Sequence, residues 1–152
     1  MKDSNDAVFG AWVGDGIRPS KGAYYGSGES CVACASCYGL LLQCDRFLWK
    51  LTTDDKLRVF KWSGKNDYVA LCEPEYISFG GGFVVSSLSF KPSLFITRFR
   101  DGHYGLYLDE TLSDGSSAHC PTFDNEPLCS AGPRQGEAVT FECVGLEVWG
   151  IS

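Results

Sequence analysis

Several features are scarce or missing in this chain, and each absence excludes a class of protein. No stretch approaches the ~18–20 consecutive apolar residues of a membrane-spanning helix, so we expect no membrane insertion. The 13 basic residues are outnumbered by 19 acidic ones, and the net charge of −6 disfavours a nucleic-acid partner, which would need a basic face. The polar start, residues 1–6, lacks the pattern of a secretory signal, so we expect a reducing compartment and free thiols.

Glycine and aromatic residues are abundant in contrast. The chain has 18 glycines in 152 residues and is 14% aromatic, a composition that favours turns and strands over long helices. Clusters of Gly, Asp, Ser and Asn, such as 113–117, are expected to form turns. Alternating apolar residues predict strands at 8–13, 47–51, 57–62, 68–72, 76–79, 106–108 and 144–148. This spacing predicts one mainly-β domain, a β-sandwich of antiparallel sheets.

The four tryptophans, Trp12, Trp49, Trp62 and Trp149, all lie in these alternating segments. An indole ring buries a large apolar area when it is packed inside a protein. We therefore expect the four side chains to contribute to the core.

The most conspicuous chemical pattern is Cys31-x-x-Cys34-x-x-Cys37, followed by Cys44. Three thiolates at this spacing suit an iron–sulfur cluster or part of a zinc site, although Cys44 is too distant for the usual ferredoxin run. A thioredoxin-like redox pair would need a βαβ unit, which the strand pattern does not provide. We expect ordinary free thiols and no bound metal, and we keep a redox-active or metal-binding protein as the alternative function.

Other residues suggest chemistry less strongly. Gly80-Gly81-Gly82 lacks the spacing of a phosphate-binding loop, so a tight turn or bulge with closely approaching backbones is expected. Cys120 and His119, with acidic residues nearby, are a conceivable nucleophile arrangement, and Asp109-Glu110 a conceivable acid–base pair. Surface loops explain both more simply, and we predict no catalytic residue and no cofactor. A further hypothesis is direct scavenging of oxidants by exposed thiols such as Cys120 or Cys129, which requires a low thiol pKa.

A set of short motifs, taken in order, resembles the TLDc domain, the module of oxidation resistance proteins. The motif sequences are most similar to those of the fungal type. The motifs are Tyr25-Gly26-Ser27-Gly28-Glu29, Ile77-Ser78-Phe79-Gly80-Gly81-Gly82, Tyr104-Gly105-Leu106-Tyr107-Leu108-Asp109, Gly115-Ser116-Ser117, Cys120-Pro121-Thr122-Phe123 with Asn125, and Glu147-Val148-Trp149-Gly150. The resemblance implies a β-sandwich of two antiparallel sheets with a few flanking helices.

The resemblance also implies a function. The family protects cells against oxidative damage, has no cofactor or agreed catalytic centre, and binds the peripheral sector of the vacuolar proton-pumping ATPase. We therefore expect a non-enzymatic binding module in the cytoplasm that is recruited to the vacuolar membrane, with the mitochondrion as a second location.

The residues carried over by motif are expected either to shape turns or to contact the partner. Glycines would act through backbone shape, whereas the two carboxylates would accept hydrogen bonds that lock turns. The set comprises Gly26, Gly28, Glu29, Gly80, Gly81, Asp109, Gly115, Ser116 and Gly150.

The chain departs from the family pattern in three places. Residues 1–152 are expected to form a single TLDc domain that lacks the usual N-terminal part. Residues 31–46 and 83–100 are extra stretches, and both are apolar. Our hypothesis is that both are translated introns, and the rival interpretation is a genuine insertion in which residues 83–85 and 94–97 add a hairpin.

Overall fold

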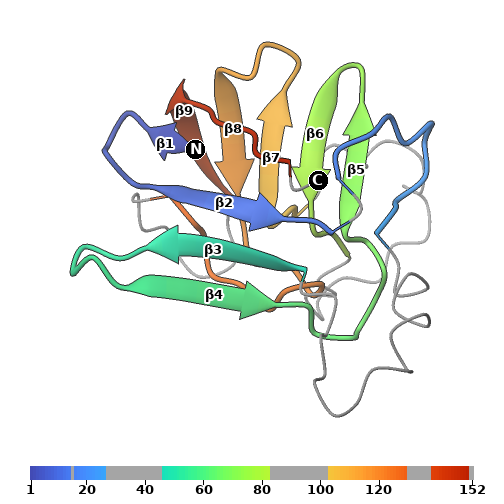
Figure 1. Ribbon diagram of the computed structural model, residues 1–152, viewed down its shortest axis with the longest axis horizontal. Helices are drawn as coiled ribbons and strands as arrows, with labels where there is room; N and C mark the ends of the chain where they lie inside the picture. The colour runs from blue at the N-terminus through green and yellow to red at the C-terminus, as the bar shows by residue number, and fades with distance from the viewer. Residues whose placement is uncertain (15, 27–45, 83–102, 130–137, 151–152) are drawn as a thin grey trace, which may run out of the picture.

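Two antiparallel sheets stack to form the protein (Figure 1). The computed structural model describes residues 1–14, 16–26, 46–82, 103–129 and 138–150. The predicted mainly-β sandwich is confirmed. These described ranges contain no helix, so the flanking helices implied by the resemblance are not found within them.

Among the described residues, the larger sheet has six strands and the smaller has three. The larger sheet has the order β1 (Lys2–Asp3), β9 (Val139–Gly145), β8 (Asp114–Ser117), β7 (Leu106–Asp109), β6 (Tyr76–Phe79), β5 (Ala70–Glu73). The smaller sheet has the order β2 (Phe9–Trp12), β3 (Phe47–Leu51), β4 (Leu57–Lys61). Figure 1 shows that the strands of the smaller sheet run across those of the larger one.

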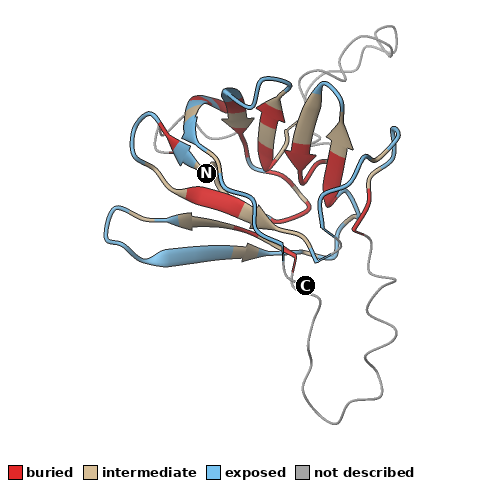
Figure 2. Cartoon of the chain, turned by 45° about the horizontal axis from the view of Figure 1, so that its top comes forward, coloured by how far each residue is buried: buried red, intermediate tan, exposed pale blue. Residues whose placement is uncertain are grey.

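The core lies between the two sheets and follows from strand alternation. Leu106 and Leu108 of β7 point inward and are fully buried, whereas Tyr107 between them is only partly covered. Phe9 of β2 packs edge-on against Phe141 of β9, with 4.9 Å between the ring centroids. Burial of side chains of this size stabilises the fold by roughly 1.5–3 kcal/mol each. Figure 2 shows buried segments in strands of both layers.

The prediction of a strand at 144–148 is wrong in its position. The last strand is Val139–Gly145, in which Val139 and Phe141 are buried and Thr140 is exposed. Alternation produces a strand only where neighbouring strands accept its backbone hydrogen bonds, and β1 reaches no further than Gly145. The side chain of Val148 is 68% exposed as a result.

The tryptophans were also predicted wrongly, since none of them is in the buried core. Trp149 is 80% exposed and Trp62 39% exposed, while Trp12 and Trp49 are half-buried. The pairing of Gly10 with Trp49 places that indole on the outer face of the smaller sheet. A period of two identifies the two faces of a strand but does not say which face is covered.

β8 is a strand built from residues that we expected to form a turn. Its sequence, Asp114-Gly115-Ser116-Ser117, pairs with both β7 and β9. Gly115 makes this possible because it lies in close contact with the Tyr107 carbonyl and the Phe141 ring. A Cβ atom at this position would come within 2.5 Å of the carbonyl oxygen of Tyr107.

Replacement of Gly115 by alanine should therefore destabilise the protein. The added methyl group has no room, so we expect the free energy of unfolding to fall by about 1–3 kcal/mol in guanidinium chloride denaturation followed by tryptophan fluorescence. Gly14→Ala is the matched control, since nothing lies within 4 Å of a Cβ atom there, and it should stay within ~0.5 kcal/mol of the parent. Equal stability of the two variants would show that β8 does not pack as described.

Candidate functional site

Three of the predicted site glycines meet at the start of β5. The Gly80 N–H donates to the Val69 carbonyl at 2.9 Å, and a Cβ atom on Gly26 would lie 3.1 Å from the Val69 side chain. Gly81 follows directly and approaches the hydroxyl of Tyr24, to which a Cβ atom would come within 2.9 Å. The structure thus gathers Gly26 and Gly80 around Val69, and Gly81 beside the neighbouring Tyr68.

Gly80 shows why a glycine is required in the triple-glycine segment. Its φ is +74°, a left-handed conformation that costs other residues roughly 1–3 kcal/mol. A Cβ atom would also lie 2.5 Å from the Cys120 sulfur and 2.9 Å from the Phe123 ring. The atoms that crowd Gly80, Gly81 and Gly82 belong to side chains, so the close approach of two backbones expected for this segment stays a prediction.

A buried hydroxyl fixes the loop that follows β8. Thr122 is fully buried, and its Oγ1 accepts a hydrogen bond from the Gly81 N–H at 2.9 Å. The same Oγ1 lies 2.8 Å from Asn66 Oδ1 and 2.9 Å from the Gly81 carbonyl oxygen, either of which can accept its proton. One hydroxyl therefore joins three segments that are remote in sequence, a role that its sequence context alone does not reveal.

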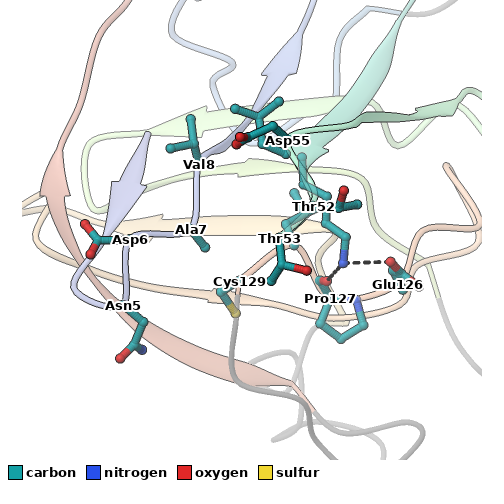
Figure 3. Close-up of a pocket in the computed structure, with 13 residues that line it drawn as sticks. Asn5, Asp6, Ala7, Val8, Thr52, Thr53, Asp55, Glu126, Pro127 and Cys129 are labelled. Atoms are coloured by element: carbon teal, nitrogen blue, oxygen red, sulfur yellow. Dashed lines mark hydrogen bonds and ion pairs between the residues drawn. The ribbon is translucent and has the colours of Figure 1, made fainter.

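The end of the same loop reaches the smaller sheet. Glu126 Oε1 lies 2.6 Å from the Lys50 ammonium and 2.8 Å from the Arg58 guanidinium. The Lys50 ammonium also donates to the Pro127 carbonyl at 3.1 Å. Figure 3 shows Glu126 and Pro127, each reached by a dashed contact, among the residues that line a groove of about 690 Å³. The groove lies where the turn at residues 5–8, the turn after β3 and the loop at 126–129 meet. The charged side chains of Lys50 and Glu126 in this groove already pair with each other.

A second group of predicted residues lies in the β7–β8 hairpin. Ser116 pairs with Tyr107, and Asp109 Oδ1 accepts hydrogen bonds from the Thr111 hydroxyl at 2.9 Å and from the Asp114 N–H at 3.2 Å. Asp109 faces Tyr76 at the start of β6, whereas Gly80 follows the end of that strand. The hairpin group and the glycine group are therefore at opposite ends of β6.

The Asp109 carboxylate acts on the turn itself. Partial desolvation is the largest influence and raises its pKa, but hydrogen bonds from Thr111, Asp114 and Ser113 together outweigh it and hold the pKa below 3.8. The charged form is thus favoured by folding. Its contribution to stability is present above pH 3.8 and is lost as the pH falls through the lower pKa of the folded state. Turn-locking is the role that these contacts support.

The structure assigns no contact role to the remaining predicted site residues. Gly150 is exposed, and nothing lies within 4 Å of a Cβ atom there, so its position makes no steric demand for glycine. Gly28 and Glu29 lie outside the described residues, as do Cys31, Cys34, Cys37 and Cys44. The extra stretches fall there too, except for Arg46, so the intron and insertion hypotheses stay predictions.

The exposed-thiol hypothesis is contradicted for both of its cysteines. Cys120 and Cys129 are buried, and burial raises the pKa of each thiol to about 11. The Cys120 sulfur lies 3.1 Å from Asn125 Oδ1, and His119 is instead 3.8 Å from Asp124 on the surface, so the conceivable nucleophile arrangement is not assembled. Neither buried thiol is available as a thiolate at neutral pH.

Two classes of site are missing from the part of the chain that the structure describes. No group of three or more His, Cys, Asp or Glu side chains there is arranged to hold a metal ion. No helix among the same residues has the length and apolar character to cross a membrane.

Comparison with known proteins gives a consistent result. The family model described as the TLDc domain matches residues 1–152. The chain is 37% identical over 98% of its length to oxidation resistance protein 1 of Cryptococcus neoformans, covering 25% of that protein. It is 31% identical over 99% of its length to oxidation resistance protein 1 of Yarrowia lipolytica, covering 48%. The Schizosaccharomyces pombe protein of the same name is 27% identical, and the chain covers 59% of it.

The described residues form a β-sandwich whose turns are held by close glycine contacts and buried side-chain hydrogen bonds. The family match over the whole chain makes the assignment specific: this protein belongs to the TLDc domain family. The chain spans a quarter to somewhat more than half of the length of these curated relatives.

Removal of the Thr122 hydroxyl should weaken the glycine turn. Thr122→Val keeps the shape but leaves the buried Gly81 N–H without its acceptor, so we expect a loss of about 1–3 kcal/mol in the free energy of unfolding. Thr140→Val is the control, because Thr140 is on the exposed face of β9 and should change stability by less than ~0.5 kcal/mol. If both variants were equally stable, the Thr122 network would not fix the turn.

The buried thiols should resist alkylation. We expect iodoacetamide at neutral pH to leave Cys120 and Cys129 unlabelled in the native protein and to label both after unfolding, as read by mass spectrometry of digested peptides. Because folding favours the neutral thiols, their stabilising effect is full below the ordinary thiol pKa of 9.0 and declines as the pH rises towards about 11. Rapid native labelling of either cysteine would reinstate the scavenging hypothesis.

Proposed function

We propose that this chain is a non-enzymatic module that protects cells against oxidative stress by binding the peripheral sector of the vacuolar proton-pumping ATPase and regulating its assembly or activity. The observation that carries the proposal is the TLDc family match over residues 1–152, together with relatives named oxidation resistance protein 1. We place this activity in the cytoplasm and at the vacuolar membrane, with the mitochondrion as the second candidate.

The structure supports a binding role through the way its turns are held. The β7–β8 hairpin and the glycine turn are stabilised by hydrogen bonds within the chain, which present a rigid surface to a partner and lower the entropy cost of association. Exposed apolar side chains such as Trp149 and Leu57 are available for contact. The burial of Cys120 and Cys129 disfavours thiol chemistry at these two residues, whereas Cys72 and Cys143 are partly exposed.

The first test is co-elution of the purified chain with the isolated peripheral sector on a sizing column. We expect a shared peak for the parent chain. In Asp109→Ala the hairpin loses the carboxylate that holds it, so binding and thermal stability should fall together. A variant that keeps its stability but loses binding would instead make Asp109 a direct contact.

Two controls make the outcome interpretable. Trp149→Ala changes a side chain that is 80% exposed, so any loss of binding reports on the surface rather than on folding.

Metal analysis of protein purified without oxygen tests the alternative function: stoichiometric iron or zinc would favour the cluster at Cys31, Cys34, Cys37 and Cys44. A folded parent chain that never co-elutes would refute the proposed partner.

A further inference from the structure

Five of the seven tyrosines of the chain gather into one group at β5, β6 and β7. They come from segments that are far apart in sequence and meet only in the folded protein. The members of this tyrosine cluster are Tyr24, Tyr68, Tyr76, Tyr104 and Tyr107.

Strand register explains the position of the rings. Tyr107 pairs with Ser78 and Tyr76 with Asp109, so Tyr76 and Tyr107 are diagonal neighbours on β6 and β7, which lie side by side in Figure 1. Leu106 and Leu108 occupy the core face of β7, so Tyr107 lies on the opposite, outer face of the sheet. The cluster is therefore built on a regular sheet rather than on a loop.

The rings are close enough to react with one another. Tyr76 and Tyr107 stack with centroids 5.6 Å apart and 29° between the ring planes, and Tyr104 and Tyr107 stack at 5.7 Å and 20°. The Tyr76–Tyr104 pair is at 6.3 Å, and Tyr24 lies 4.8 Å from Tyr68 at the other side of the group.

The phenols also interact through their hydroxyl groups. Burial, with further contributions from neighbouring tyrosines and a hydrogen bond with Tyr104, raises the pKa of Tyr24 above its usual range. Burial raises the pKa of Tyr76 to about 12, again with a hydrogen bond to Tyr104 among the causes. At neutral pH Tyr24 and Tyr76 are therefore protonated phenols, and each holds a hydrogen atom that an oxidant can remove.

We propose that Tyr76, Tyr104 and Tyr107 form an oxidative modification site at which peroxyl radicals convert a stacked pair of phenols into dityrosine. Each radical removes one phenolic hydrogen atom and becomes a hydroperoxide. The two phenoxyl radicals then couple by a carbon–carbon bond between ring carbons ortho to the phenolic oxygens. The hydrogens on those carbons move to the oxygens, which restores two phenols, so two radicals are consumed for each cross-link.

This chemistry goes beyond the proposed binding role and does not depend on it. It is stoichiometric, since a cross-linked pair is spent, and it needs no cofactor. It also differs from thiol scavenging, because Cys120 and Cys129 are buried while Tyr76, Tyr104 and Tyr107 are partly exposed. Failure of ATPase binding would leave the tyrosine site standing, and failure of cross-linking would leave the binding role standing.

The test exposes dilute, folded protein to peroxyl radicals released by a water-soluble azo initiator in air. Dityrosine is followed by its fluorescence and located by mass spectrometry of digested peptides. We expect cross-links within one chain that join two of Tyr76, Tyr104 and Tyr107. Tyr107→Phe keeps the ring but removes the phenol, and should lower the yield by roughly two thirds, because Tyr107 belongs to two of the three ring pairs.

Tyr25→Phe is the matched control, since it also removes one hydroxyl but from a ring that is 7% exposed and outside the cluster, and its yield should equal that of the parent. Thermal unfolding verifies that both variants are folded, and the parent chain in concentrated guanidinium chloride should lose the preference for these pairs. Cross-links that form only between chains, that map to Tyr38, or that persist unchanged in Tyr107→Phe would overturn the proposal. Oxidation confined to the exposed Trp149 would overturn it as well.

Discussion

The buried side-chain amide of Asn125 holds the segment on which both halves of the molecule depend. Its Nδ2 donates to the carbonyls of Ala118 and Glu126 at 2.8 and 3.0 Å, and its Oδ1 accepts from the Cys120 N–H at 3.3 Å. An amide buried in this way is stable only when its donors and acceptors are paired, so the loop has one permitted shape. That shape carries Cys120 and Thr122 to the larger sheet and Glu126 to the cations of the smaller sheet. The two layers are thus joined by a connection as well as by their shared core.

Glycines that leave room for neighbouring groups are the second recurring feature of the structure. Gly80 allows the end of β6 to meet the Cys120 sulfur, and Gly115 allows β8 to lie beneath the Phe141 ring. Gly81 does the same on the outer face, where the Tyr24 hydroxyl reaches the backbone beside the tyrosine cluster. Glycines at separate positions therefore affect both the core and the surface at which we place the oxidative chemistry. Close packing also holds the stacked rings of Tyr76 and Tyr107 with their centroids 5.6 Å apart.

Sequence pattern predicted the sandwich and most of its strands because alternation and turn residues report local geometry. It failed where the outcome depends on a remote neighbour. The tryptophans alternate correctly, but only the packed structure decides that the face bearing Trp49 is the outer one. β8 resembles a turn in composition and becomes a strand because two flanking strands pair with it. Gly80 has close contacts with Cys120 and Phe123, and Asp109 accepts hydrogen bonds within its hairpin, but the predicted site itself stays a prediction. The Thr122 hydroxyl network and the tyrosine cluster were not anticipated, since each joins residues that only the fold brings together.

The pairing of β1 with β9 has a consequence for how the chain is made. Lys2 lies opposite Gly145, so β1 gains its partner only after β9, at the other end of the domain, has been synthesised. Contacts of such long sequence separation slow folding, because the entropy of closing a large loop is lost before the contact is gained. Until β9 arrives, the hydrogen-bonding groups of β8 are open to other chains. Chaperones that cover exposed strands would protect a nascent chain of this topology from aggregation.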